Sequence, residues 1–195
     1  MRLHAATAGV LLLVFAACGS GGSSSKGTTS TSASAPSSSP SSSAVTTSQA
    51  ATGGSTTPVS VAPTHPTAHL VAVRAARQET VDRVVFEFTE QVPGYKVSYE
   101  KKPIMGTSGQ EVPLSESFVL QFHMQQASAF DVDKGQPTYT GPKQVQPAGA
   151  RAVGELKQVE DFEGVLTWVA GLRTQVPFRV STLTSPPRLV IDLPS

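Results

Sequence analysis

The fold of this chain follows from one short stretch, Val84-Val85-Phe86-Glu87-Phe88-Thr89. Side chains alternate between two faces along a β-strand, so the apolar residues at 84, 86 and 88 share one face while Glu87 and Thr89 take the other. This is the pattern of a half-buried strand. Pro93-Gly94 then forms a turn, and residues 95–99 alternate in the same way. The two segments are therefore predicted to form a hairpin.

The same alternation recurs outward from this hairpin and predicts six further strands, at 70–75, 118–124, 152–159, 164–172, 177–184 and 188–193. Many short strands separated by Gly, Pro and polar turns are typical of an all-β domain, and we predict a single β-sandwich. Trp168 alternates with apolar neighbours and is expected in the core. In the last strand Leu189, Ile191 and Leu193 are expected to point inward. The best helical candidate, Ala127 to Lys134, is limited to a turn or two.

Three parts of different composition predict the domain organisation. Residues 67–195 have an ordinary globular composition and form the sandwich domain. Residues 18–66 comprise Cys18 and a segment of nearly all Ser, Thr, Gly, Ala and Pro, with Lys26 as the only full charge. Such a segment cannot bury enough apolar surface to offset the entropy of ordering, so we predict a disordered linker. Residues 1–17 have the basic start and short apolar run of a signal peptide.

The junction Phe15-Ala16-Ala17-Cys18 resembles a bacterial lipobox, in which the cysteine is lipidated and becomes the new N-terminus. We therefore expect Cys18, the only cysteine, to anchor the protein to the extracytoplasmic face of the cell membrane. The apolar run is too short for a transmembrane helix, which needs roughly 20 residues. The alternative is a cysteine that happens to follow an ordinary signal peptide.

The charge of the sandwich domain excludes nucleic acid as a partner. Two of the 15 basic residues, Arg2 and Lys26, lie outside it, whereas all 14 acidic residues lie inside, so its formal charge is −1. Binding to a polyanion needs a strongly basic face, and the longest basic run is only Lys101-Lys102.

No constellation for catalysis, metal binding or a cofactor is predicted. His65, His69 and His123 are not spaced as a zinc pair on one element. The glycine-flanked stretch 106–109 is predicted to be a hairpin tip. Asp161 and Glu163 are paired carboxylates of the kind that glycosidases use. Their position at a strand end, however, favours a location in solvent or in a turn over a catalytic role.

Several blocks in the same order resemble an AMIN-like domain of actinobacterial-type lipoproteins over residues 68–195. They lie at 82–88, 93–95, 137–142, 161–172, 177–180 and 185–193. The resemblance implies a non-catalytic β-sandwich of the cell envelope that contacts peptidoglycan or envelope partners. It transfers no ligand residues.

These observations leave three hypotheses. The first is a lipid-anchored envelope binding module that contacts peptidoglycan or a wall-associated partner. The second is a protein-interaction or assembly subunit that recruits an envelope enzyme through an exposed sheet edge or an aromatic patch. The third is a small glycan hydrolase acting through Asp161 and Glu163. Aromatic and arginine side chains dominate recognition surfaces, so the predicted binding face comprises Tyr95, Tyr99, Tyr139, Trp168, Arg173 and Arg179.

Overall fold

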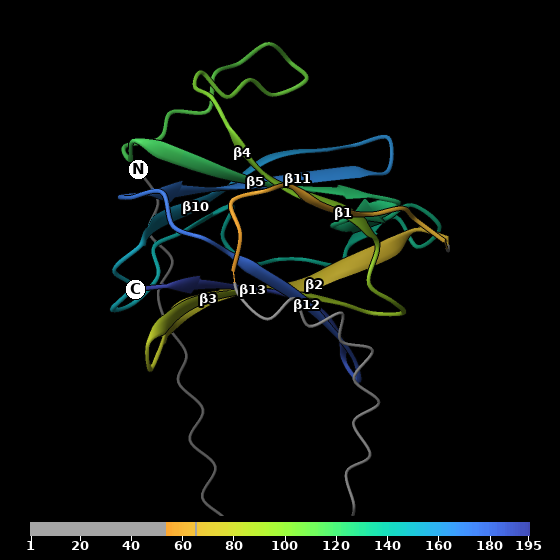
Figure 1. Cartoon of the computed structure of the whole chain (residues 1–195). Helices are drawn as coiled ribbons and strands as arrows, with labels where there is room; N and C mark the ends of the chain where they lie inside the picture. Colours follow the sequence, from red (N-terminus) through yellow and green to blue (C-terminus); the bar gives the residue numbers. More distant parts are fainter. Residues whose placement is uncertain (1–53, 65) are drawn as a thin grey trace, which may run out of the picture. The chain divides into compact units, whose positions relative to one another are not determined.

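The computed structural model describes residues 54–64 and 66–195 (Figure 1). The predicted signal peptide, Cys18 and most of the predicted linker lie outside the described residues. Within them, no helix is long and apolar enough to span a bilayer.

The described residues form thirteen β-strands. Their bounds are β1 Val59–Val61, β2 Ala68–Gln78, β3 Val81–Phe88, β4 Gly94–Glu100, β5 Phe118–Gln125, β6 Ala127–Ser128, β7 Phe130–Asp131, β8 Gln136–Pro137, β9 Gln144–Val145, β10 Val153–Phe162, β11 Val165–Leu172, β12 Arg179–Thr184 and β13 Pro187–Pro194.

Two sheets form the layers of a β-sandwich (Figure 1). One sheet has six strands in the order β1-β4-β5-β11-β10-β9, and the other has five in the order β12-β13-β3-β2-β6. Neighbouring strands in these sheets run antiparallel except β2 and β6, which are parallel. The prediction of an all-β sandwich domain is confirmed.

Aromatic side chains from both sheets meet in the core. Phe86 of β3 lies 5.2 Å from Phe122 of β5 and 6.0 Å from Trp168 of β11, measured between ring centroids. Trp168 is fully buried, with 0% of its surface exposed, so the prediction of a core tryptophan is confirmed. In β13, Leu189, Ile191 and Leu193 are all fully buried, as their alternation predicts.

The predicted hairpin between residues 84–89 and 95–99 is wrong. β3 pairs with β2 and β13, whereas β4 pairs with β1 and β5 in the other sheet. The chain between them crosses from one layer to the other. One apolar face suits two strands that face each other across a core as well as two that lie side by side, so alternation alone cannot tell these arrangements apart.

The predicted helical turn at Ala127–Lys134 is also wrong, because β6, β7 and a turn occupy it. The side chains of Ser128 and Asp131 accept hydrogen bonds from the backbone N–H groups of Phe130 and Lys134, at 3.0 Å each. Such local bonds give the backbone an alternative to a helix.

The ordered domain begins earlier than residue 67, so the predicted linker is too long at its C-terminal end. β1 pairs with β4 along three residues, and Val59 packs against the core. Ser55 forms an antiparallel bridge with Phe178. Backbone pairing and one half-buried valine thus order a segment whose composition looks like linker.

A long loop between β4 and β5 covers one end of the outer face of the six-stranded sheet. Ile104 packs there against Val119 of β5 and Val169 of β11. At the loop tip, Gly106 donates a hydrogen bond to Gln110, and Gly109 has a φ of 74°, so the predicted hairpin tip is confirmed. The rest of this outer face stays uncovered by the loop.

Asp82, at the start of β3, fixes one end of the sandwich. Its Oδ2 accepts hydrogen bonds from the backbone N–H groups of residues 151–153 at 2.7–3.0 Å, and its Oδ1 accepts one from the Ser195 hydroxyl at 2.8 Å. Nη1 of Arg77 lies 3.9 Å from Asp82 Oδ1. Only 1% of Asp82 is exposed. We call these residues the Asp82 cluster.

Candidate functional site

Three aromatic members of the predicted binding face serve the fold. Trp168 is in the core, and Tyr139 packs edge-on against it at 5.9 Å while donating a hydrogen bond to the Pro142 carbonyl at 2.8 Å. The Tyr99 hydroxyl donates to the Val176 carbonyl at 2.6 Å. Trp168 is therefore not available to a ligand at the surface, and the hydroxyls of Tyr99 and Tyr139 are already bonded.

The two predicted arginines have different surroundings. Arg173 donates to the carbonyls of Ala150, Arg151 and Val153 at 3.0–3.3 Å, which holds the segment after β9. Arg179 is exposed at the start of β12, opposite Asp192 in the register. The six predicted residues thus do not form one surface.

Tyr95 is the member of the predicted face that lines surface hollows. It comes from β4 and is 9% exposed. Burial raises the pKa of its hydroxyl above the ordinary value, so the phenol stays protonated at neutral pH. It borders two hollows, one between the sheets and one on the outer face of the six-stranded sheet.

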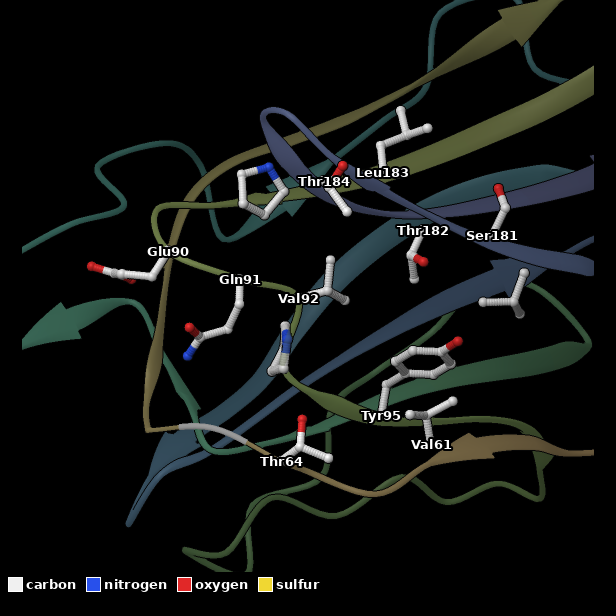
Figure 2. Close-up of a pocket in the computed structure, with 13 residues that line it drawn as sticks. Val61, Thr64, Glu90, Gln91, Val92, Tyr95, Ser181, Thr182, Leu183 and Thr184 are labelled. Atoms are coloured by element: carbon white, nitrogen blue, oxygen red, sulfur yellow. The ribbon is translucent and has the colours of Figure 1, made fainter. Parts of the chain in front are cut away.

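The first hollow, which we call the edge cleft, lies where the two sheets open beside β12 (Figure 2). Its volume is about 600 Å³. One wall is β12, and the opposite wall comprises β1, the segment after it and the turn before β4. The lining residues are Val61, Thr64, Glu90, Gln91, Val92, Pro93, Tyr95, Val180, Ser181, Thr182, Leu183, Thr184 and Pro187.

The second hollow, which we call the outer hollow, has a volume of about 470 Å³ and is mostly polar. Lys96 of β4 and the alternate residues Gln121, His123 and Gln125 of β5 line it. These side chains project from the outer face because their neighbours in each strand point into the core. Ser60, Val61, Ala62 and Tyr95 complete the lining.

Strand register aligns polar residues from five strands into what we call the polar row: Ser60, Lys96, His123, Thr167 and Glu160. His123 Nδ1 lies 3.3 Å from Thr167 Oγ1, and Thr167 donates to Glu160 at 3.0 Å. Thr167 can then accept from the Nδ1–H of His123, which leaves Nε2 as an acceptor. Lys96 and Ser60 are exposed, whereas Thr167 is buried and Glu160 half-buried, so the row is open at the Ser60 end.

The chemistry of the polar row favours binding. Its order places the hydroxyl between the imidazole and the carboxylate, whereas nucleophilic catalysis needs the imidazole in the middle. Thr167 is also only 1% exposed, which hides its oxygen from a substrate. Cationic, amide and hydroxyl groups in one hollow can together bond hydroxyls, amides and carboxylates.

The other sequence candidates for chemistry lie apart from the polar row. Asp161 accepts a hydrogen bond from the Ala129 N–H at 2.9 Å. Glu163 is exposed in the turn between β10 and β11, with a φ of 50°. His69 lies 3.7 Å from Glu90, and His65 falls outside the described residues. In the part of the chain that the structure describes, no three potential metal ligands are grouped.

Sequence reasoning missed both the polar row and the length of the β12 edge. The row depends on register, including a shift between Gln158 and Glu160 that turns Glu160 outward next to Thr167. The outward alternation of His123 and its neighbours was the available signal. It could not indicate which residues of other strands stand beside them.

Comparison with known proteins gives one result. The model of the AMIN-like domain family matches residues 68–195. The matched residues include the β12 wall of the edge cleft and the turn before β4, but not β1 or the segment after it. They also include every residue of the polar row except Ser60. No curated protein and no solved structure matches the chain significantly.

Proposed function

This chain belongs to the AMIN-like domain family, and from that membership we propose that it is a lipid-anchored, non-catalytic binding module of the cell envelope that contacts peptidoglycan. A family assignment gives the fold, so the ligand has to be argued from a site. The outer hollow and the polar row beside it are the observation that carries the proposal.

The groups around the outer hollow match the chemistry of peptidoglycan. Its glycan chain carries hydroxyl and acetamido groups, and its stem peptides end in carboxylates. Gln121 and Gln125 each offer an amide donor and acceptor, and Lys96 offers an ammonium for a carboxylate.

Lipid attachment at Cys18 supports this function by holding the module near the wall. Two or more acyl chains bind a membrane firmly, at about 0.8 kcal/mol per buried methylene, whereas one chain binds marginally. Tethering raises the local concentration of a binding site, so weak intrinsic affinity suffices. Replacement of Cys18 by Ala should move the protein from the membrane to the soluble fraction, and an unchanged distribution would exclude the anchor.

Sedimentation with purified insoluble peptidoglycan tests the proposed ligand. The full-length protein in detergent should pellet with the wall material, and Lys96→Glu should reduce the bound fraction several-fold because it reverses a charge at the outer hollow. Lys143→Glu is the matched control, since Lys143 is exposed and outside both hollows. Equal pelleting of both variants and the unmodified protein would argue against this site.

A protein-interaction or assembly role is the second candidate function. It is favoured by a different observation, the exposed strand β12 at the edge of the five-stranded sheet.

A further inference from the structure

The four edges of the two main sheets differ in length. The six-stranded sheet ends in β1, with three residues, and β9, with two. The five-stranded sheet ends in β6, with two residues, and β12, with six. Among the described residues, β12 is therefore the longest of the four terminal strands, although parts of β2, β4 and β10 also extend beyond their short neighbours. An edge strand leaves every second backbone N–H and C=O without a ladder partner.

Beyond Arg179 at its start, β12 lacks the features that usually protect an edge strand from pairing. Natural edges carry charges, prolines or bulges. Residues 180–184 contain no charge and no proline, and β12 pairs with β13 without a register shift. Valine, leucine and threonine are good strand formers. The edge is thus suited to accept another strand.

The edge cleft lies directly beneath this edge. Val180 and Thr182 stand opposite Ile191 and Leu189, whose side chains are buried, so they share the inward face. In Figure 2, Thr182, Tyr95 and Val92 surround the same space. A strand added to β12 would direct every second side chain into the cleft.

The chain itself already forms one isolated backbone bridge next to β12. Ser55 and Phe178, the residue before β12, exchange two backbone hydrogen bonds of 3.1 and 2.9 Å. The backbone at this corner thus pairs with a segment that comes from outside the five-stranded sheet.

We propose that β12 binds an extended peptide segment of another protein by strand addition, with alternate small or β-branched side chains of that segment in the edge cleft. Backbone bonds would supply affinity and the cleft would supply specificity, as in known modes of strand addition. The lining holds one charged side chain, Glu90, which lies at the Thr184 end in Figure 2. The best fit is therefore a segment of uncharged residues with one cationic residue near the Thr184 end of the cleft.

The walls of the cleft favour a peptide over a second copy of the chain. The wall opposite β12 comes from β1, the residues after it and the turn before β4. A folded sandwich would bring its own second layer against these segments, whereas a single extended strand needs only the cleft. The volume of about 600 Å³ is in the range of ligand pockets, about 300–1,000 Å³.

A labelled hexapeptide of alternating threonine and valine, with one terminal lysine, is the probe. Titrated against the full-length protein in detergent up to about 1 mM, it should bind saturably by fluorescence anisotropy. The same peptide N-methylated at alternate residues should bind at least about tenfold more weakly, because it lacks the donors for the ladder.

Two variants locate the binding. Thr182→Lys places a charge in the cleft and should weaken peptide binding at least about tenfold. Val132→Lys is the control, since Val132 is 81% exposed in the β7–β8 turn and outside the cleft. Circular dichroism checks the fold of each, and Leu183→Lys, at an exposed position of the same strand, replaces Thr182→Lys if that variant unfolds.

The outcomes separate this proposal from the proposed function. Peptide binding that depends on the N–H groups and on Thr182 supports it, with peptidoglycan pelleting unchanged in Thr182→Lys. No binding, or binding indifferent to N-methylation, overturns it. Self-association that Thr182→Lys abolishes, without peptide binding, identifies a second copy as the occupant and also overturns it. If Lys96→Glu no longer pellets with peptidoglycan but binds the peptide normally, the outer hollow binds peptidoglycan independently of β12, and the β12 proposal stands.

Discussion

At the Asp82 cluster one buried carboxylate bonds three backbone N–H groups and a hydroxyl, whereas along β12 a row of backbone groups has no strand partner among the described residues. The first arrangement is needed because a buried N–H without an acceptor costs about 1–3 kcal/mol. The unpaired backbone groups of β12 cost little free energy, because water can form hydrogen bonds with them. The comparison indicates that the sandwich is fixed at one place and left open to a ligand at another.

Removal of the Asp82 carboxylate should have the largest effect. Asp82→Ala leaves three backbone N–H groups without an acceptor, two of them buried, so the free energy of unfolding should fall by at least about 2 kcal/mol. Urea denaturation measures this loss. Asp133→Ala, at an exposed position, is the control and should leave the midpoint unchanged. If Asp82→Ala also left it unchanged, the cluster would not be what fixes this end of the sandwich.

The pH dependence of stability should reveal the same carboxylate. Burial by itself raises the pKa of Asp82, but hydrogen bonds from Val153, Ser195, Ala152 and Arg151 outweigh it and hold the pKa below its ordinary value. The group therefore stabilises the fold above its unfolded pKa, about 3.9, and this contribution disappears as pH falls through the folded pKa.

Asp82→Asn sharpens this test because asparagine keeps an acceptor oxygen but does not titrate in this range. Its unfolding free energy should depend less on pH below about 5 than that of the unmodified protein. Parallel curves for the two proteins would show that other carboxylates control acid unfolding.

The polar row should show an intermediate effect, since one of its members, Thr167, is buried while its Ser60 end is open. Thr167→Val keeps the shape but removes the hydroxyl that bonds His123 and Glu160, which should cost about 1 kcal/mol. Peptidoglycan pelleting should fall as well, because the imidazole is no longer held. Thermal unfolding and the pelleting assay measure the two effects, and full retention of both would separate the row from the site.

A change at β12 should affect stability least. Thr182→Lys alters a half-buried edge residue without breaking a buried bond, so the free energy of unfolding should stay within about 0.5 kcal/mol. A loss as large as that of Asp82→Ala would mean that the edge is part of the fixed structure, and the contrast between the two regions would fail.

Local alternation predicted much of the fold. It located β3, β5 and β13 and the inward residues of β13, and it put Trp168 in the core. It assigned β3 and β4 to one hairpin because facing strands and adjacent strands share the same pattern. Non-local backbone pairing ordered β1, whose composition carries no signal beyond two valines.

The candidate site was harder to predict from the sequence, for reasons visible in its residues. Tyr99 and Trp168 are of the types that bind ligands, but the same size and apolar surface let them fill the core. Lys96 and Glu160 are 64 positions apart in the sequence and join one row only through the register of four strands. The β12 edge is defined by the absence of a neighbouring strand, which no local pattern encodes.

The bridge between Ser55 and Phe178 has a mechanical consequence. A pulling force on the chain that precedes Gly54 would reach these two hydrogen bonds first and the three-residue ladder of β1 and β4 next. Val61 of β1 belongs to the wall of the edge cleft. Tension along the N-terminal chain would therefore peel back one side of the cleft before it strained the rest of the sandwich.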